Sequence, residues 1–226
     1  MKEKAAPYLG MALLPFVFIA LELAVSLSAS LFYGTMDWVV ISDQYGISAT
    51  LIHYGLTCIV WVMGAWLLYN LAKKRGFDLF ENKSKVPLLN WIIVLLILIL
   101  SIIFKYISWD MRFKPFVEFM YFNRIFGNQA ILAFVGQYIY YFVESILILF
   151  IVIFGQKFGE LAFKKTNVPW GGILCGLTWG LGHILTQDLF TGILGAAVSV
   201  AYGIVYLLLK RNAIYTYPIL ALMFML

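Results

Sequence analysis

The sequence predicts an all-α fold, a polytopic transmembrane helical bundle of about seven spans with a short last one. Three observations lead to this prediction. Apolar residues make up 63% of the 226 residues and charged residues only 12%, which is more hydrophobic surface than one soluble core can bury. Several apolar runs reach the roughly 20 residues that a helix needs to cross a hydrocarbon core of about 30 Å. Finally, most Lys and Arg residues lie in short loops between these runs.

The first half of the chain contains three of the expected spans. The first apolar run follows Lys2 and Lys4, as a signal peptide would, but it is too long for one and contains Glu22, so we expect it to remain as a mature span. The segment from Trp109 to Asn128 mixes charged and aromatic residues, which favours a position in the outer interface, either as a membrane-anchored loop or as a substrate gate. The expected spans are 8–33, 47–72 and 86–107.

The second half contains the remaining spans. Gly172, Gly176 and Gly180 recur every four residues, and such a stripe of small residues lets another helix approach closely. The last apolar run is about fourteen residues, short of the roughly twenty needed to cross, so we expect it to end inside the bilayer and to leave a slot in the bundle. The expected spans are 129–154, one beginning near Pro169, 189–209 and 213–226. No linker or repeat is visible, so one membrane domain accounts for residues 1–226.

The distribution of basic residues predicts the orientation. The N-terminus, residues 73–85, residues 157–165 and the Lys210-Arg211 pair fall on one side of the predicted membrane. Because the side richer in Lys and Arg is cytoplasmic, we expect the N-terminus to be inside. The other side holds only Lys105, Arg112, Lys114 and Arg124. This clustering also leaves no basic face for nucleic acid.

Several classes of site are disfavoured. Cys58 and Cys175 lie in predicted spans without a Cys-x-x-Cys pattern, so neither a disulfide framework nor a zinc site follows. A classical metal site needs three or four ligands, and the histidines are only His53 and His183, so we expect no metal and no cofactor. The chain has no Gly-x-Ser-x-Gly elbow, Walker loop or dinucleotide fingerprint.

Two ionisable side chains that interrupt apolar runs are the strongest candidates for chemistry. Glu144 lies roughly ten residues, and His183 roughly fourteen, from the same end of successive spans, so at about 1.5 Å per residue their depths agree to within about one turn. A carboxylate beside an imidazole in a dry site can take a proton from water while the imidazole stabilises an oxyanion. The alternative is that both residues only satisfy one another or other polar groups in packing.

Glu22 and His53 are weaker candidates. For Glu22 a structural ion pair or the lining of a polar cavity is as good an explanation as catalysis. His53 lies near the outer end of its span, where contact with interfacial water is a sufficient explanation.

A family resemblance adds to this interpretation. The run Phe142-Val-Glu144-Ser145, followed about forty residues later by Leu177-Thr-Trp179-Gly-Leu-Gly-His183, resembles the CAAX-protease and bacteriocin-processing (CPBP, or Abi) family of intramembrane glutamyl endopeptidases. The family's motifs are Glu-Glu-x-x-x-Arg, Phe-x-x-x-His and His-x-x-x-Asn or Asp, carried on an α-helical bundle. The resemblance implies that Glu144 activates water and that His183 belongs to the oxyanion side. It covers a family-like core at about 129–226.

The match to these motifs is incomplete. Ser145 replaces the second Glu and Leu149 stands where Arg belongs, whereas Trp179 matches the aromatic residue of the second motif. The third motif should fall in the last apolar run, where Met223 or its neighbour occupies the position of His. The resemblance makes Trp179 and Met223 candidates for the lining of a substrate cavity.

These departures favour a degenerate member of the family. We expect it to lie in a bacterial cell membrane. Such a pseudoprotease-like subunit would bind another membrane protein or peptide, in its former active-site cavity or on the glycine faces Gly172, Gly176 and Gly180. The alternative is an active intramembrane endopeptidase with Glu144 as general base and His183 as oxyanion stabiliser. A weaker alternative is a small-molecule or ion transporter. The first two hypotheses require Glu144 and His183 to face a shared polar cavity near the start of the last helix.

Overall fold

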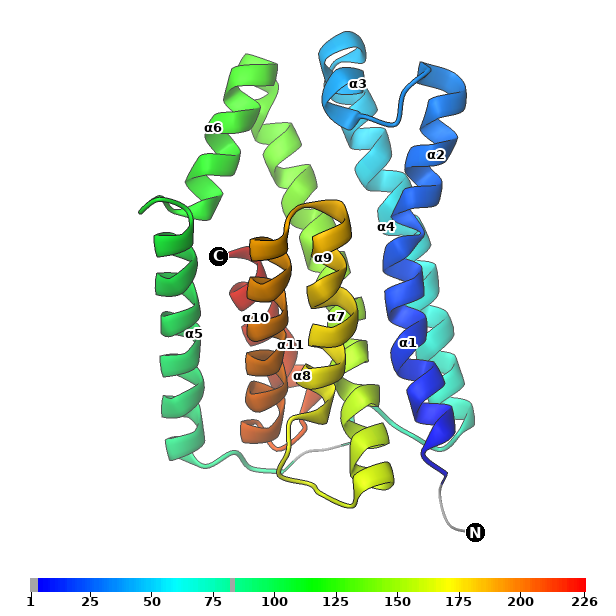
Figure 1. The fold of residues 1–226 in the computed structure, drawn as a ribbon, viewed down its shortest axis with the longest axis vertical. Coiled ribbons are helices and arrows are strands. Elements are labelled where there is room, and N and C mark those ends of the chain that lie inside the picture. The colour runs from blue at the N-terminus through cyan, green and yellow to red at the C-terminus, as the bar shows by residue number, and fades with distance from the viewer. Residues whose placement is uncertain (1–3, 82–83) are drawn as a thin grey trace.

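The computed structural model describes residues 4–81 and 84–226, and the regular structure within these ranges is helical. The helices run roughly along the long axis of the molecule (Figure 1). Five stretches are long and apolar enough to cross a membrane, which confirms the all-α prediction and agrees with an integral membrane protein. They are Ala6–Tyr33, Ile47–Lys74, Leu88–Ser108, Lys114–Phe163 and Leu189–Leu208. Lys2 and Lys83, which belong to the predicted basic side, lie outside the described residues.

The first expected span consists of two successive helices. The break falls at Leu21, so Glu22 is the first residue of the second helix. Just before the break, the carbonyl oxygen of Phe18 accepts a hydrogen bond from Trp61 Nε1 at 2.9 Å, which ties the kinked region to the helix that carries Trp61. The elements of this part are α1 (Ala6–Ala20), α2 (Glu22–Tyr33), α3 (Trp38–Tyr45) and α4 (Ile47–Lys74).

The segment expected to lie in the outer interface is a packed helix. It turns back at Gly127, whose φ of +51° suits glycine, and runs beside the first part of the next helix as a hairpin (Figure 1). Glu118 and Phe122 are buried, so this helix is not a loose interfacial loop. The elements are α5 (Leu88–Ser108), α6 (Lys114–Phe126), the 3₁₀ turn η1 (Gly127–Gln129) and α7 (Ala130–Phe163).

Helix α7 is the central element of the bundle. It packs against α1, α4, α6, α8 and α11. Every residue from Leu147 to Gln156 is buried, which explains why this stretch of sequence is apolar on all sides rather than on one stripe. Glu144 lies one turn before that stretch, so its carboxylate is held inside the protein.

The glycine stripe Gly172, Gly176 and Gly180 packs against another helix of the same chain. A Cβ atom on Gly180 would lie 2.6 Å from the backbone nitrogen of Ala196, and one on Gly176 would lie 3.0 Å from the carbonyl oxygen of Ala196. Gly172 approaches the backbone of Gly203 in the same way. The stripe is therefore filled by α10 and is not free to receive a partner, contrary to our expectation. The elements are α8 (Trp170–Cys175), the π-helical turn η2 (Gly176–Gly180), α9 (Leu181–Thr186), α10 (Leu189–Leu208) and α11 (Ala213–Met225).

The helices end at two different levels. Figure 1 shows that α5, α9 and α11 end well below the upper end of the molecule. That upper end consists of α2, α3 and α6 with the adjoining parts of α4 and α7. Lys105 Nζ donates hydrogen bonds to the carbonyl oxygens of Met223 and Phe224, the latter at 2.7 Å, and Lys114 Nζ reaches that of Phe224 at 3.3 Å. Two cations therefore meet the negative end of the α11 helix dipole.

Candidate functional site

Glu144 and Trp179 are joined by a buried hydrogen bond. The indole Nε1 of Trp179 donates to Oε1 of Glu144 at 2.8 Å, and both side chains are at least nine-tenths buried. The carboxylate comes from α7 and the indole from η2, so the bond links two helices across the core. The other carboxylate oxygen, Oε2, makes no hydrogen bond with the part of the chain that the structure describes. Glu144 thus keeps one acceptor atom free.

His183 lies on the other side of Trp179. Its Nδ1 is 2.8 Å from the carbonyl oxygen of Trp179, and the imidazole and indole rings meet edge to face with centroids 4.6 Å apart. Because a carbonyl oxygen can only accept, Nδ1 must carry a proton in this contact. In neutral His183 the remaining nitrogen, Nε2, therefore holds a lone pair. The site offers two acceptors, Glu144 Oε2 and His183 Nε2, on either side of one indole.

A local irregularity of the helix supports this arrangement. Gly176–Gly180 forms a π-helical turn inside the helical segment from Trp170 to Thr186. π-helical turns are rare and frequently mark functional sites, because the extra residue re-aims the side chains around it. Here the turn contains Trp179 and ends three residues before His183. The sequence predicted Glu144, Trp179 and His183 as a group, and the structure brings them together around Trp179 without a direct hydrogen bond between Glu144 and His183.

Met223 does not belong to this group in the way expected. Its side chain is fully buried in the main apolar core, and its backbone oxygen accepts a hydrogen bond from Lys105. The neighbouring residue, Phe224, is the one whose ring packs edge to face against Trp179, at a centroid distance of 5.4 Å. Met223 lines neither of the two cavities described below, and its role as cavity lining stays a prediction.

Tyr202 is a residue of this region that sequence reasoning missed. Its ring lies 6.4 Å from that of Trp179, and its hydroxyl is buried without a hydrogen-bond partner among the described residues. A buried hydroxyl without a partner is costly, which marks the surroundings of Trp179 as a place where a water molecule or ligand group can be accommodated. In the sequence, the one sign of this role is that Tyr202 places a hydroxyl group within a mostly apolar run.

A second polar cluster lies one turn from Glu144 along α7. Glu118 of α6 accepts hydrogen bonds from the hydroxyls of Tyr138 and Tyr141, at 2.9 and 2.8 Å, and from Gln137 Nε2 at 3.0 Å. Lys114 Nζ is 3.9 Å from the same carboxylate and 4.5 Å from the centre of the Tyr141 ring. This cluster is fully bonded, which indicates a structural role in holding α6 to α7.

The two weaker candidates form a pair of their own. His53 Nε2 lies 3.2 Å from Oε1 of Glu22, and the His53 side chain is only 8% exposed. The explanation of His53 by contact with water stays a prediction, because its ring contacts Trp38 and Glu22 and also lines a small cavity. The ion-pair explanation of Glu22 agrees with this contact.

No group of three His, Cys, Asp or Glu side chains that could hold a metal ion occurs among residues 4–81 and 84–226, and Cys58 and Cys175 are free thiols.

A cavity of about 310 Å³ lies near Lys157 and Arg211, and another of about 90 Å³ lies between α3, α4 and α6. Neither is lined by Glu144 or His183, so the polar cavity expected beside the last helix is not one of these two.

Comparison of the chain with protein-family models, with curated proteins and with solved structures found no match.

Proposed function

We propose that this chain is a CPBP-like integral membrane protein of the degenerate kind, which binds a segment of another membrane protein or peptide at Glu144 and His183 without cleaving it. The observation that supports this proposal is the geometry around Trp179. One indole fixes a carboxylate through its N–H and an imidazole through its backbone carbonyl, and leaves Oε2 and Nε2 as two free acceptors. Two such acceptors recognise hydrogen-bond donors such as peptide N–H, hydroxyl or ammonium groups.

Binding is favoured over cleavage because the site has no cation to stabilise an oxyanion, and the Tyr202 hydroxyl is the one donor near Trp179 that no described residue uses. Hydrolysis of a peptide bond places negative charge on the carbonyl oxygen, which needs N–H or O–H donors aimed at it. Neutral His183 presents a lone pair at Nε2, and Leu149, at the place of the family's Arg, is a buried apolar residue. Glu144 makes no ion pair within the described ranges, so no cation supplies the missing charge.

The alternative is an active endopeptidase, and one feature favours it. If His183 is protonated, its Nε2–H becomes a donor, and Glu144 Oε2 can accept a proton from water. The carboxylate and the imidazole then have the complementary roles that hydrolysis requires. Both hypotheses place the peptide at Glu144 and His183. They differ in whether the bound peptide is released intact or cleaved.

We further infer the arrangement in the membrane. Residues 170–186 and α11 run beside the five long helical stretches and complete about seven spans, of which the last is short. The side that carries Lys73, Lys164 and Lys210 is the cytoplasmic side of a bacterial cell membrane, and the N-terminus lies there.

Purification from the native membrane in mild detergent, followed by native mass spectrometry, tests the proposal. We expect the wild-type chain to retain an intact peptide or protein of defined mass in stoichiometric amount. Glu144→Gln should lose it, because the amide keeps an acceptor for Trp179 but replaces Oε2 by a donor. Glu118→Gln, a buried carboxylate outside the site, is the control and should retain it.

Two results would contradict the proposal. A wild-type chain that is always monomeric and without a bound partner would exclude stable binding. Fragments with new termini that vanish in Glu144→Gln and in His183→Asn would show that the protein cleaves its ligand, and would establish the endopeptidase alternative instead.

A further inference from the structure

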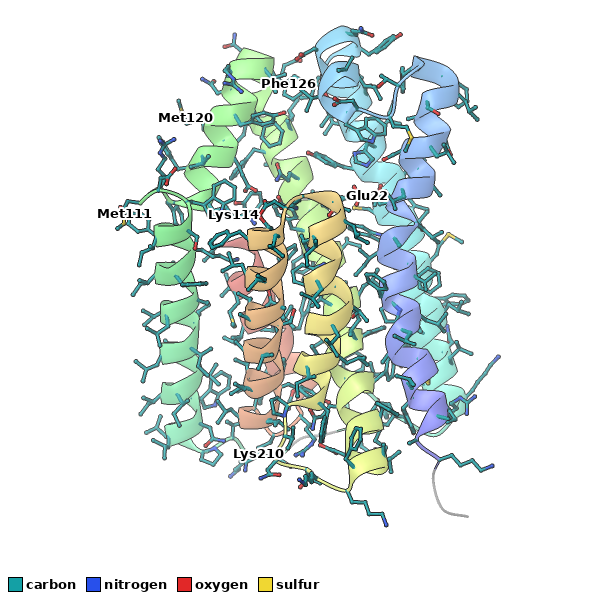
Figure 2. All side chains as sticks on the ribbon, in the orientation of Figure 1. Glu22, Met111, Lys114, Met120, Phe126 and Lys210 are labelled. Atoms are coloured by element: carbon teal, nitrogen blue, oxygen red, sulfur yellow. The ribbon has the colours of Figure 1, made fainter. Side chains whose placement is uncertain are left out.

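Glu22 and His53 come from the start of α2 and the outer part of α4. Their contact of 3.2 Å is the one carboxylate–imidazole pair at ion-pair distance among the described residues, since His183 approaches no carboxylate so closely. Figure 2 labels Glu22 near the level where α9 ends, on the opposite side of α9 from Lys114. Burying an ionisable pair between apolar helices costs free energy. Such pairs are therefore functional candidates, and proton transfer is one of their common roles.

The imidazole ring of His53 is held in one orientation. It stacks on the indole of Trp38 with centroids 4.1 Å apart and an angle of 10° between the planes. Trp38 is fixed in turn, because its Nε1 donates to Ser26 Oγ at 2.8 Å. Stacking on an indole stabilises the positive form of an imidazole by a cation–π interaction. Trp38 and Glu22 therefore contact the face and the edge of the same imidazole ring.

Neither nitrogen of His53 is used in packing. Nε2 is buried and faces Glu22, but the approach is not aligned for a hydrogen bond, and Nδ1 makes no hydrogen bond with a described residue. His183 differs, because its Nδ1 is bonded to a backbone carbonyl. A buried polar atom without a hydrogen-bond partner is costly, so the unbonded Nε2 of His53 calls for an explanation other than packing.

The ring also faces a space that can hold water. The cavity of about 90 Å³ between α3, α4 and α6 is lined by His53 together with the hydroxyl-bearing residues Ser42, Thr50 and Tyr121. Apolar and aromatic side chains form the rest of the lining, but these polar groups and this volume are sufficient for water. The titratable groups that face His53 from the surrounding helices are Glu22 of α2, Tyr54 of α4, Tyr121 of α6 and Tyr140 of α7. The charged groups near the same cavity are Asp37, Asp43, Glu118 and Arg124.

We propose that Glu22 and His53 form a proton-binding pair that faces the cavity between α3, α4 and α6. Neutral His53 carries its proton on Nε2, toward the Glu22 carboxylate. A hydronium ion in the cavity transfers a proton to Nδ1 and leaves as water, and the resulting imidazolium is balanced by Glu22 and by the face of Trp38. Tyr140, whose ring is 6.4 Å from that of His53, is one helical turn from Glu144, so the pair lies beside the candidate site.

Nitrogen NMR of the full chain labelled with ¹⁵N-histidine in lipid nanodiscs tests this proposal. The chain has only two histidines, and His183→Asn assigns their signals. Near pH 8, we expect the proton on Nε2 in His53 and on Nδ1 in His183. On acidification to about pH 5, His53 should gain a second proton reversibly while the protein stays folded.

Two carboxylate variants separate the pair from general effects of charge. Glu22→Gln should lower the proton affinity of His53 by about tenfold or more, because it removes the adjacent charge. Glu160→Gln, whose carboxylate pairs with Arg211 near the other end of α7, should leave His53 unchanged. The proposal is overturned if wild-type His53 stays neutral at about pH 5, if its neutral form carries the proton on Nδ1, or if both variants affect it equally. The wild-type titration alone decides the matter if Glu22→Gln does not fold.

Discussion

Trp179 is the side chain on which the candidate site depends, because it contacts both ionisable residues. Trp179→Phe keeps a ring in the core but removes the N–H that Glu144 accepts. We expect it to lower the free energy of unfolding by about 1 kcal/mol, the usual size of a hydrogen bond between membrane helices. Unfolding by denaturing detergent, followed by circular dichroism, measures this change. Trp66→Phe is the control and should have no effect, because Trp66 is 68% exposed. Equal stability of both variants would contradict the bond.

Two substitutions of His183 distinguish the roles of its two ring nitrogens. Asn places its amide nitrogen near the position of Nδ1, and Gln places its amide near that of Nε2. His183→Asn should therefore keep the contact with the Trp179 carbonyl and the stability of the fold, but lose ligand retention. His183→Gln should lose stability, by about 1 kcal/mol. Unfolding curves and native mass spectra of both variants check this. The reverse pattern would show that Nε2 is the structural nitrogen.

Depth along the helices predicted that Glu144 and His183 lie close together, but not that Glu118 is buried as well. Glu144 and His183 were placed together because they lie at similar distances from the same end of successive spans, and Trp179 lies between them in the structure. The contact of Glu22 with His53 could not be predicted in this way, because it depends on how α3 returns the chain and where Trp38 stacks. Contacts between residues far apart in sequence need the packing of the helices, which spacing does not contain.

Among the elements, the segment from α8 to α9 depends on close approach to α10. Gly180→Ala would put a methyl group 2.6 Å from the backbone nitrogen of Ala196, which no side-chain rotation relieves. We expect a loss of about 1–3 kcal/mol in the free energy of unfolding. Gly55→Ala is the matched control, since nothing lies within 4 Å of a Cβ there and alanine is the better helix former. A tolerated Gly180→Ala would contradict the packing of η2 on α10.

The apolar runs predicted the long helices well, because length and hydrophobicity are local properties of the sequence. Two features of the elements were not predictable from them. The glycine stripe indicated a close helix contact, but a small-residue face is the same whether α10 or another protein covers it. The mixture of charged and aromatic residues in 109–128 predicts a segment in the outer interface, and only the contact of α6 with α7 shows which of these residues are buried.

On the scale of the whole molecule, the basic loops lie at one end. Lys210 and the start of α1 are at the same end of the molecule, and α3 is at the other (Figures 1 and 2). In a background without Cys58 and Cys175, Asp43→Cys should react with a membrane-impermeant maleimide in intact cells. Lys164→Cys should react only after the membrane is permeabilised, since both positions are exposed on the protein surface and differ only in side. The opposite pattern would reverse the proposed orientation.

The central claim is that Glu144, Trp179 and His183, from two parts of the chain, form one site. The indole N–H region of a ¹⁵N–¹H spectrum tests it directly, because the seven tryptophans give few signals and Trp179→Phe identifies the one that matters. We predict that Glu144→Gln and His183→Asn both shift the Trp179 signal, whereas Glu118→Gln leaves it in place. A Trp179 signal that does not respond to Glu144→Gln would contradict the account.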